Sequence, residues 1–246
     1  MPPSSAPIPD DVCPICHGAG YLRIDAPLGS PNFGRLIMCE CRLAEIEQQR
    51  SRDYAEMSSF GATFESLTFE SFDPGIPHVR PAYDAAREFA QNPDGWLFFL
   101  GSYGCGKTHL AAAIAHEVLE HQNMRVLFQV VPDLLDHLRS TFAPDRATSY
   151  DERFNSIRMA DLLVLDDLGT ENSTPWATEK LFQIINFRYN DRRPTIISSN
   201  RDFKDLDPRI ASRLADPRIC RPIYIQADDY RMRRSMLAQS PKRRSR

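Results

Sequence analysis

One segment of the chain has residues whose types and spacing suit the binding of nucleotide phosphates. Residues 101–108 read GSYGCGKT and match the pattern G-x-x-x-x-G-K-[ST]. Glycines let backbone N–H groups converge on the phosphates, the lysine reaches the β- and γ-phosphates, and the hydroxyl binds Mg²⁺. We therefore predict an ATP site with Lys107 and Thr108 in the last two roles. The residues expected to touch the nucleotide and its metal are Gly101, Ser102, Tyr103, Gly104, Cys105, Gly106, Lys107, Thr108, His109 and Asp166.

Acidic and polar residues follow two other apolar runs. Asp166 and Asp167 come directly after LLVL, and Asn200 ends the run TIISSN. We expect Asp166 to hold Mg²⁺ through water and Asp167 to orient and deprotonate the attacking water. The three polar residues that end this run, Ser198, Ser199 and Asn200, are candidates to sense the γ-phosphate. Asn200 is our choice, although an asparagine there also suits a turn or a helix cap.

Two arginines, Arg209 and Arg213, lie four residues apart in DPRIASRL, on one face of a short helix. An arginine on a surface helix can complete a neighbouring subunit's site by stabilising charge in the transition state. The competing interpretation is that both are ordinary surface charges.

Four cysteines near the start of the chain form two close pairs. Cys13, Cys16, Cys39 and Cys41 can close a tetrahedral zinc site, and metal binding would supply roughly 10–16 kcal/mol to fold a segment with almost no core. His17 in place of one cysteine is an alternative. A c-type haem, suggested by C-x-x-C-H, leaves the second pair unexplained, and a redox dithiol needs a thioredoxin-like strand and helix that this Gly/Pro-rich stretch lacks.

The elements that must position these residues follow from the apolar pattern. Short apolar runs alternate with helical spacing, which predicts an α/β fold in which helices flank a parallel sheet of five strands. The expected strands are residues 96–100, 126–131, 162–165, 195–198 and 223–225. Helix faces are expected at Leu110, Ile114 and Val118, and at Leu181, Ile184 and Ile185.

We expect four parts: a zinc-binding module (1–41), a helical linker and Phe-rich clasp (42–77), an ATPase core (78–230) and a basic tail (231–246). The 246 residues have room for one ordinary domain and a small appendage, and the net charge of -3 gives no overall basic field. No apolar run approaches the roughly 18 residues that a membrane span needs, and the start lacks a signal-peptide pattern, so we expect a cytoplasmic protein with no membrane partner.

Three blocks of sequence resemble a known family. FLGSYGCGKTHLAAAIA, LLVLDDLGTENSTPWATEKLFQIINFRYNDRRPTIISSN and RIASRL are similar to the DnaC/IstB branch of the AAA+ ATPases, which contains bacterial helicase loaders and transposition helpers. The resemblance implies an AAA+ core with a small or absent lid and ATP hydrolysis at an interface between subunits. It places Arg213 at the family's trans-acting arginine, with Arg209 as second choice, and makes Arg231 a weak candidate for the lid arginine.

The resemblance also implies nucleic-acid contact. Related proteins carry extra helix between the second and third strands, where single-stranded DNA is bound, and residues 132–160 have that location here. This segment contains Arg139, Arg146, Arg153 and Arg158, although a solvated helix face would have the same composition. The tail adds seven basic residues and no acid: Arg231, Arg233, Arg234, Lys242, Arg243, Arg244 and Arg246.

Together these features lead to one hypothesis and two alternatives. The first is a nucleoid-associated bacterial replication factor that loads a hexameric replicative DNA helicase onto single-stranded DNA, self-associates across ATP, and grips the helicase through the zinc module. The second is an IstB-like transposition helper that acts on duplex DNA and a transposase. The third is an ATP-gated adaptor with little turnover, which Asp167 leaves open because it is one methylene shorter than the glutamate common at such sites.

Overall fold

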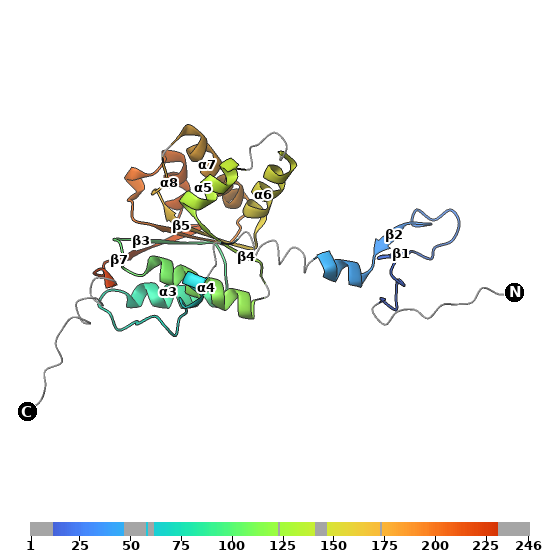
Figure 1. Cartoon of the computed structure of the whole chain (residues 1–246), viewed down its shortest axis with the longest axis horizontal. Coiled ribbons are helices and arrows are strands. Elements are labelled where there is room, and N and C mark those ends of the chain that lie inside the picture. The colour runs from blue at the N-terminus through green and yellow to red at the C-terminus, as the bar shows by residue number, and fades with distance from the viewer. Residues whose placement is uncertain are drawn as a thin grey trace, which may run out of the picture. The chain divides into compact units, whose positions relative to one another are not determined.

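The computed structural model describes residues 12–46, 58, 62–122, 124–140, 147–172 and 174–230 (Figure 1). The chain divides into two compact units, Met1–Asp53 and Tyr54–Arg246. None of the described helices is long and apolar enough to span a membrane. Arg146 and the whole basic tail, including Arg231, lie outside the described residues.

The larger unit is built on a five-stranded sheet with the order β4-β5-β6-β3-β7, in which every neighbouring pair is parallel. The predicted α/β architecture is therefore confirmed. The strands are β3 (Trp96–Gly101), β4 (Val126–Val130), β5 (Leu162–Leu168), β6 (Thr195–Ser199) and β7 (Cys220–Ile225). The largest differences from prediction are at β5, which runs three residues further, and at β7, which begins three residues earlier; the other strands differ by one residue at their ends. Val131, expected at the end of a strand, begins a helix.

Helices cover both faces of this sheet (Figure 1). One face carries α3 (Arg80–Gln91) and α4 (Lys107–His121), and the other carries α5 (Val131–Ser140), α6 (Ala147–Met159), α7 (Pro175–Asn190) and α8 (Pro208–Leu214). A short turn of 3₁₀ helix, Phe203–Asp205, precedes α8. The helix faces predicted on α4 and α7 are buried, because they pack against the sheet. The two helical layers in turn shield both faces of the sheet from water.

The segment before α3 packs along the α3 and α4 side of the sheet. It includes α2 (Ala62–Glu65), and its Phe64 ring lies 4.8 Å from that of Phe128 on β4. Phe69 and Phe72 are buried in the same core cluster. Ser58 contacts the edge of the sheet, where its Oγ accepts from the N–H of Phe128 and donates to the carbonyl of the same residue. The expected linker helix is described only over residues 40–46.

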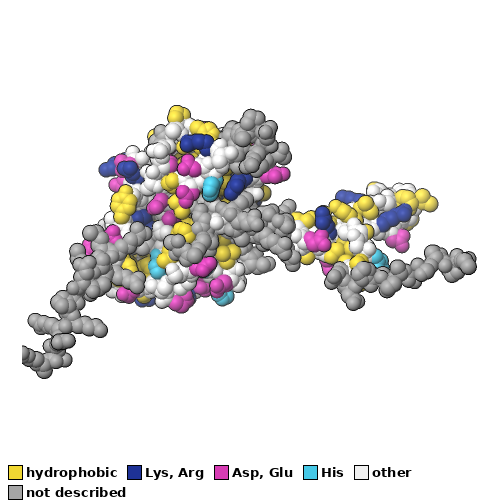
Figure 2. Space-filling view, in the orientation of Figure 1, with side chains coloured by type: hydrophobic (Ala, Val, Ile, Leu, Met, Phe, Trp, Pro, Cys, Tyr) yellow, Lys and Arg dark blue, Asp and Glu magenta, His cyan; other side chains and the backbone are white. Residues whose placement is uncertain are grey.

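The described part of the smaller unit contains a hairpin between a cysteine-bearing turn and a helix. β1 (Tyr21–Arg23) pairs antiparallel with β2 (Leu36–Met38), and this pairing brings the turn that follows Cys13 close to the start of the helix at residues 40–46, which contains Cys41. Large apolar side chains cover much of its surface (Figure 2). Those that are exposed are Ile15, Tyr21, Leu28, Phe33, Leu36, Ile37, Met38 and Leu43.

A fully buried arginine, Arg188, joins α7 to the layers around it. Its Nη1 donates to the carbonyls of Arg158 (2.9 Å) and Ala160 (2.8 Å) at the end of α6. Its Nε donates to Thr195 Oγ1 (2.9 Å) and its Nη2 to the carbonyl of Pro194, both at the start of β6. One side chain therefore ties the C-terminal end of α6 to the strand that ends beside the candidate site.

Candidate functional site

The phosphate loop connects β3 to α4. Gly106 is the residue before the first turn of α4, and its φ of 102° lies in the left-handed region that favours glycine. Gly104 has a φ of 69°, and a Cβ added there would lie 2.0 Å from Asp229 Oδ1, so only glycine fits. The first N–H groups of an α-helix have no partner within the helix and attract anions. The loop thus places backbone N–H groups, without side chains at Gly104 and Gly106, at the N-terminal, positive end of the α4 dipole.

Lys107 is 6% exposed, and its ammonium is held against the loop itself. Nζ donates to the carbonyls of Gly101 (3.0 Å) and Ser102 (2.8 Å). A buried lysine costs free energy unless its charge is solvated by polar groups, which these carbonyls supply. The charge is therefore kept within the loop, where nucleotide phosphates would replace the carbonyls as its partners.

Thr108 and Asp166 meet as the sequence predicts, although they are 58 residues apart. Thr108 Oγ1 donates to Asp166 Oδ2 at 3.0 Å, and the carboxylate also accepts from Ser198 Oγ. Asp166 is 2% exposed, and burial raises the pKa of its carboxyl group to about 6, with a further contribution from the neighbouring charge of Asp167. A hydroxyl and a carboxylate are the oxygen ligands that Mg²⁺ prefers, so these two residues fit that ion.

Asp167 lies in the strained part of β5. Its φ is 59°, which is uncommon for a residue other than glycine, and the pairing of β5 with β6 shifts between Leu165 and Leu168. The N–H of Asp167 donates to Ser198 Oγ at 3.0 Å. Ser198 thus contacts both acids. The sequence analysis named it as one of three candidates for contact with the γ-phosphate, but did not predict its contact with the acids.

Asn200 follows β6, and its Oδ1 is buried with no hydrogen-bond partner within the described residues. A buried amide oxygen without a partner is costly, and in native proteins such groups usually have a functional or solvent partner. Asn200 does not line the cavity described next, so its predicted role as a γ-phosphate sensor stays a prediction.

A cavity of about 450 Å³ opens over the phosphate loop. The predicted residues Tyr103 to His109 and Asp167 line one side. The other side is formed by the segment before α3 and by the chain after β7: Ser66, Leu67, Ser71, Phe72, Asp73, Ile76, Val79, Ala227, Asp228 and Tyr230. A polar phosphate loop faces apolar side chains across one hollow, which suits a nucleotide with its base on the apolar side.

His109 links the phosphate-loop helix to the segment that closes the cavity. Its Nε2 lies 2.9 Å from the carbonyl of Thr68 and 3.1 Å from Ser71 Oγ, and its ring meets that of Phe72 edge-on. Burial lowers the pKa of His109, which favours the neutral ring with Nε2–H donating to the Thr68 carbonyl. The structure shows these contacts of His109 with residues 68–72, and its predicted contact with nucleotide stays a prediction.

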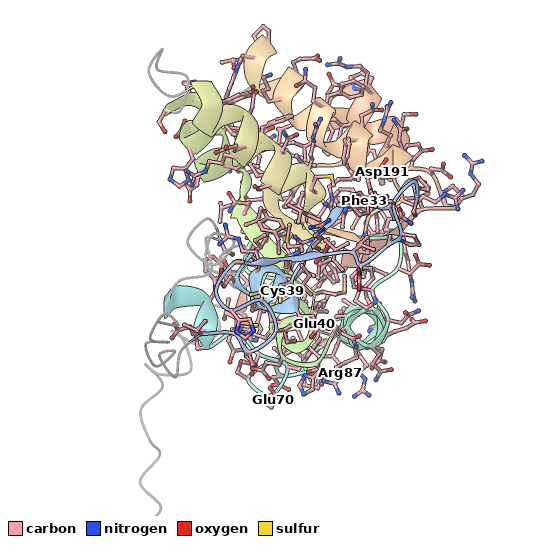
Figure 3. The ribbon with its side chains drawn as sticks, turned by 90° about the vertical axis from the view of Figure 1, so that its right-hand side faces the viewer. Phe33, Cys39, Glu40, Glu70, Arg87 and Asp191 are labelled. Atoms are coloured by element: carbon pink, nitrogen blue, oxygen red, sulfur yellow. The ribbon has the colours of Figure 1, made fainter. Side chains whose placement is uncertain are left out.

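The four cysteines of the smaller unit converge as predicted. Their Sγ atoms all lie within 4.8 Å of one another, with Cys13 and Cys39 at 3.8 Å and Cys16 and Cys41 at 3.4 Å. A tetrahedral zinc ion with Zn–S bonds near 2.3 Å places sulfurs about 3.8 Å apart, so the four thiols fit that ion. Figure 3 labels Cys39 and Glu40, where the second pair enters the helix at residues 40–46.

The thiols of the cluster differ in their surroundings, since the neighbouring Cys16 raises the pKa of the Cys41 thiol while the pKa of the Cys16 thiol itself is lowered. The Gly20 N–H donates to Cys16 Sγ at 3.3 Å, and this bond lowers the pKa of the Cys16 thiol to about 7, which favours the thiolate that binds zinc. His17 is exposed and is not part of the cluster. The geometry therefore supports the four-cysteine site over the alternatives with His17 or a haem.

The arginines predicted to meet DNA differ in their surroundings. Arg139 on α5 forms an ion pair with Asp136 (3.6 Å), and its guanidinium lies 5.2 Å from the centre of the Trp176 ring. The guanidinium of Arg158 packs 4.6 Å from the ring of Phe187. Arg153 is half-buried on α6. Trp176, which sequence reasoning missed, adds an aromatic surface beside the basic one.

Comparison with known proteins places the chain in a family. Residues 32–238 match the family described as IstB-like ATP binding protein. The chain belongs to this IstB-like family. It is 28% identical over 155 residues to the replicative helicase loader DnaC of Escherichia coli K12, which is 62% of this chain and 62% of DnaC. It is 33% identical over 144 residues to the replication initiator DnaA of Pseudothermotoga lettingae, which is 57% of this chain and 32% of that one.

Solved structures of similar proteins share the fold. The DnaC helicase loader superposes with a TM-score of 0.60 and 27% identity over 68% of this chain and all of that one. DnaI superposes with a TM-score of 0.58 and 25% identity over 69% of this chain and 96% of that one. DnaA bound to AMPPCP and single-stranded DNA superposes with a TM-score of 0.59 and 25% identity over 67% of this chain and 51% of that one. The predicted DnaC/IstB resemblance and AAA+ fold are confirmed, and ATP binding is the property that the family name carries.

Proposed function

We propose that this IstB-like protein is an ATP-dependent replication factor that loads a hexameric DNA helicase onto single-stranded DNA in the bacterial cytoplasm, at the nucleoid. The observation that carries the proposal is the four-cysteine module joined to a core that superposes on the whole DnaC helicase loader structure. We assign the zinc module to residues 1–41, the linker and clasp to 42–77, the ATPase core to 78–230 and the basic tail to 231–246.

The phosphate-loop site supports ATP hydrolysis as the activity of the core. Lys107 binds the β- and γ-phosphates, and Asp167 takes the proton of the attacking water. Asn200 orients the γ-phosphate, and Arg213 of a neighbouring subunit stabilises the charge that develops on it. Mg²⁺, held by Thr108 and Asp166, would neutralise negative charge on the phosphates. ATP thus bridges two subunits, and hydrolysis weakens their association.

The surface of the cysteine module suits a protein partner. Its described residues hold three basic and three acidic side chains: Arg23, Arg35, Arg42, Asp25, Glu40 and Glu45. With no net positive charge the module lacks the electrostatic attraction that dominates nucleic-acid binding. Its exposed apolar side chains instead resemble the core of a protein interface. The partner proposed for this surface is the replicative helicase.

The α5 and α6 region supports contact of the core with single-stranded DNA. Arg139 against Trp176 combines a cation with an aromatic face, and such pairs bind single strands through phosphate contact and base stacking. The DnaA relative of similar fold has been solved with single-stranded DNA bound. Segment 132–160 is therefore the DNA-contacting part in this proposal, with Trp176 added from α7.

A capture experiment tests the loader function. The full chain, a chain lacking residues 1–58, and the variant Leu36→Asp/Ile37→Asp are incubated with the host's hexameric helicase in ATP and in ADP. Leu36 and Ile37 are exposed and lie outside the cysteine cluster, so their replacement removes apolar surface while leaving the metal ligands intact. Glu45→Lys is the matched surface control. Capture by the full chain and the control alone supports the proposal, and no capture in either nucleotide with zinc verified present overturns it.

The second candidate is a transposition helper that acts on duplex DNA and a transposase, because the matching family is described as IstB-like. Retention of the full chain on duplex DNA in ATP, together with failure to capture the helicase, would favour it.

A further inference from the structure

The two arginines of α8 have different electrostatic surroundings. Arg209 is balanced by two carboxylates, since Nη1 donates to Glu179 Oε2 (3.0 Å) and Nε to Asp207 Oδ1 (3.2 Å). Arg213 contacts neutral acceptors: the side-chain oxygen of Asn186 and the carbonyl of Arg209. Within the part of the chain that the structure describes, no carboxylate forms an ion pair with Arg213. Among the described residues, the positive charge of Arg209 is therefore balanced by carboxylates, whereas that of Arg213 is not.

Asn186, on α7, holds one edge of the Arg213 guanidinium. Its Oδ1 accepts from Nε at 2.9 Å and also from Nη2, while Nη1 donates to the Arg209 carbonyl at 2.7 Å. A guanidinium carries five N–H groups, and these contacts use three of them. Each terminal nitrogen therefore keeps one N–H without a partner among the described residues, and a pair of N–H groups on the two terminal nitrogens matches the oxygens of a phosphate.

Two aromatic rings of α7 support the same guanidinium. Its carbon lies 4.7 Å from the centre of the Phe182 ring and 5.6 Å from that of Tyr189. The hydroxyl of Tyr189 donates to Asp216 Oδ2, which fixes that ring in turn. The side chain of Arg213 is therefore held on one edge and one face while its charge stays available.

We propose that Asn186 is a positioning residue that orients Arg213 to contact the nucleotide bound by a neighbouring subunit. The inference rests on the proposed function, in which Arg213 acts in trans. A free arginine has many rotamers, and a catalytic cation displaced by about 1 Å can lose much of its effect on the rate. Asn186 removes that freedom without adding a negative charge that would compete with the phosphates.

The test compares ATP turnover of full-length variants in the presence of single-stranded DNA. Asn186→Leu has a similar size and no acceptor, and we expect its kcat to fall about ten- to hundredfold with KM changed less than about twofold. Asn186→Asp keeps the acceptor but adds a negative charge that competes with the phosphates, so its kcat should lie between that of Asn186→Leu and that of the wild type. Asn190→Leu makes the same replacement on an exposed position of the same helix and serves as the control.

Subunit mixing separates an effect through Arg213 from a merely structural one. Asn186→Leu subunits keep their own phosphate site, and Asp167→Asn subunits keep a correctly held Arg213. In an equimolar mixture that assembles at random, about one site in four combines an intact Asp167 with a correctly held Arg213 from the neighbouring subunit. The mixture should therefore recover about a quarter of wild-type turnover. The double variant Asn186→Leu/Arg213→Ala should be no slower than Arg213→Ala alone.

The outcomes distinguish this inference from the proposed function. If Arg213→Ala is slow and Asn186→Leu is as fast as wild type, Asn186 does not position the arginine and the inference fails while the ATPase assignment stands. An unrescued mixture, or additive losses in the double variant, also overturns it. Normal turnover by Arg213→Ala, or none by the wild type, refutes the proposed function itself.

Discussion

Replacing the buried Arg188 with methionine should destabilise the larger unit. Methionine replaces the aliphatic part of the side chain, lacks the guanidinium, and so removes the donors to four acceptors. Two of these keep another partner, because the Pro194 carbonyl accepts from the Leu163 N–H at 3.3 Å and the Thr195 hydroxyl donates to the Arg193 carbonyl. For the carbonyls of Arg158 and Ala160, Arg188 is the donor that the structure shows.

The magnitude follows from those two carbonyls. Leaving a buried acceptor unpaired costs about 1–3 kcal/mol, so the pair costs about 2–6 kcal/mol. Removing a buried charge returns part of its desolvation penalty. We therefore expect a net loss of about 2–4 kcal/mol, and for a domain of this size a fall in Tm of roughly 4–16 °C.

Urea unfolding followed by tryptophan fluorescence measures this loss. The chain has two tryptophans, Trp96 and Trp176, and both belong to the larger unit, so the signal reports on the core and not on the cysteine module. Arg221→Met is the matched control, because Arg221 pairs with Glu88 on the surface and such pairs contribute about 0–1 kcal/mol. A loss below about 1 kcal/mol for Arg188→Met, equal to that of the control, would refute the reasoning.

Further changes test the nucleotide and metal sites. Lys107→Ala should abolish ATP turnover, because the phosphates lose their lysine, while the zinc content of the protein stays unchanged. Asp167→Asn should still bind ATP in equilibrium dialysis, but its turnover should fall about 10²–10⁴-fold. Normal hydrolysis by either variant would contradict the site assignment. Removal of zinc by a chelator, or the variant Cys39→Ser, should unfold the cysteine module. The unfolding transition of the core, detected by tryptophan fluorescence, should stay in place. A shift of the core transition equal to that of the module would show that the two units fold together.

Local pattern in the sequence was enough for the phosphate loop, the two acids found in β5 and the cysteine pairs. Each depends on residues within a few positions of one another, so spacing alone carries the chemistry. All five strands were also predicted, most of them because strands buried on both faces are rich in apolar residues; β7, at the edge of the sheet, is largely exposed. Their ends were less well predicted, as at β5, where the shift in pairing that strains Asp167 depends on β6 and has no local signal.

Tertiary structure decided which distant residues complete these sites. Ser198 reaches both acids because β5 and β6 are neighbours in the sheet, and Asn186 reaches Arg213 because α7 packs on α8. Trp176 becomes part of a basic surface only where α5 brings Arg139 over its ring. A single sequence records which side chains are available, whereas the packing of layers determines which of them meet, since a contact between residues far apart in the chain leaves no periodicity to detect.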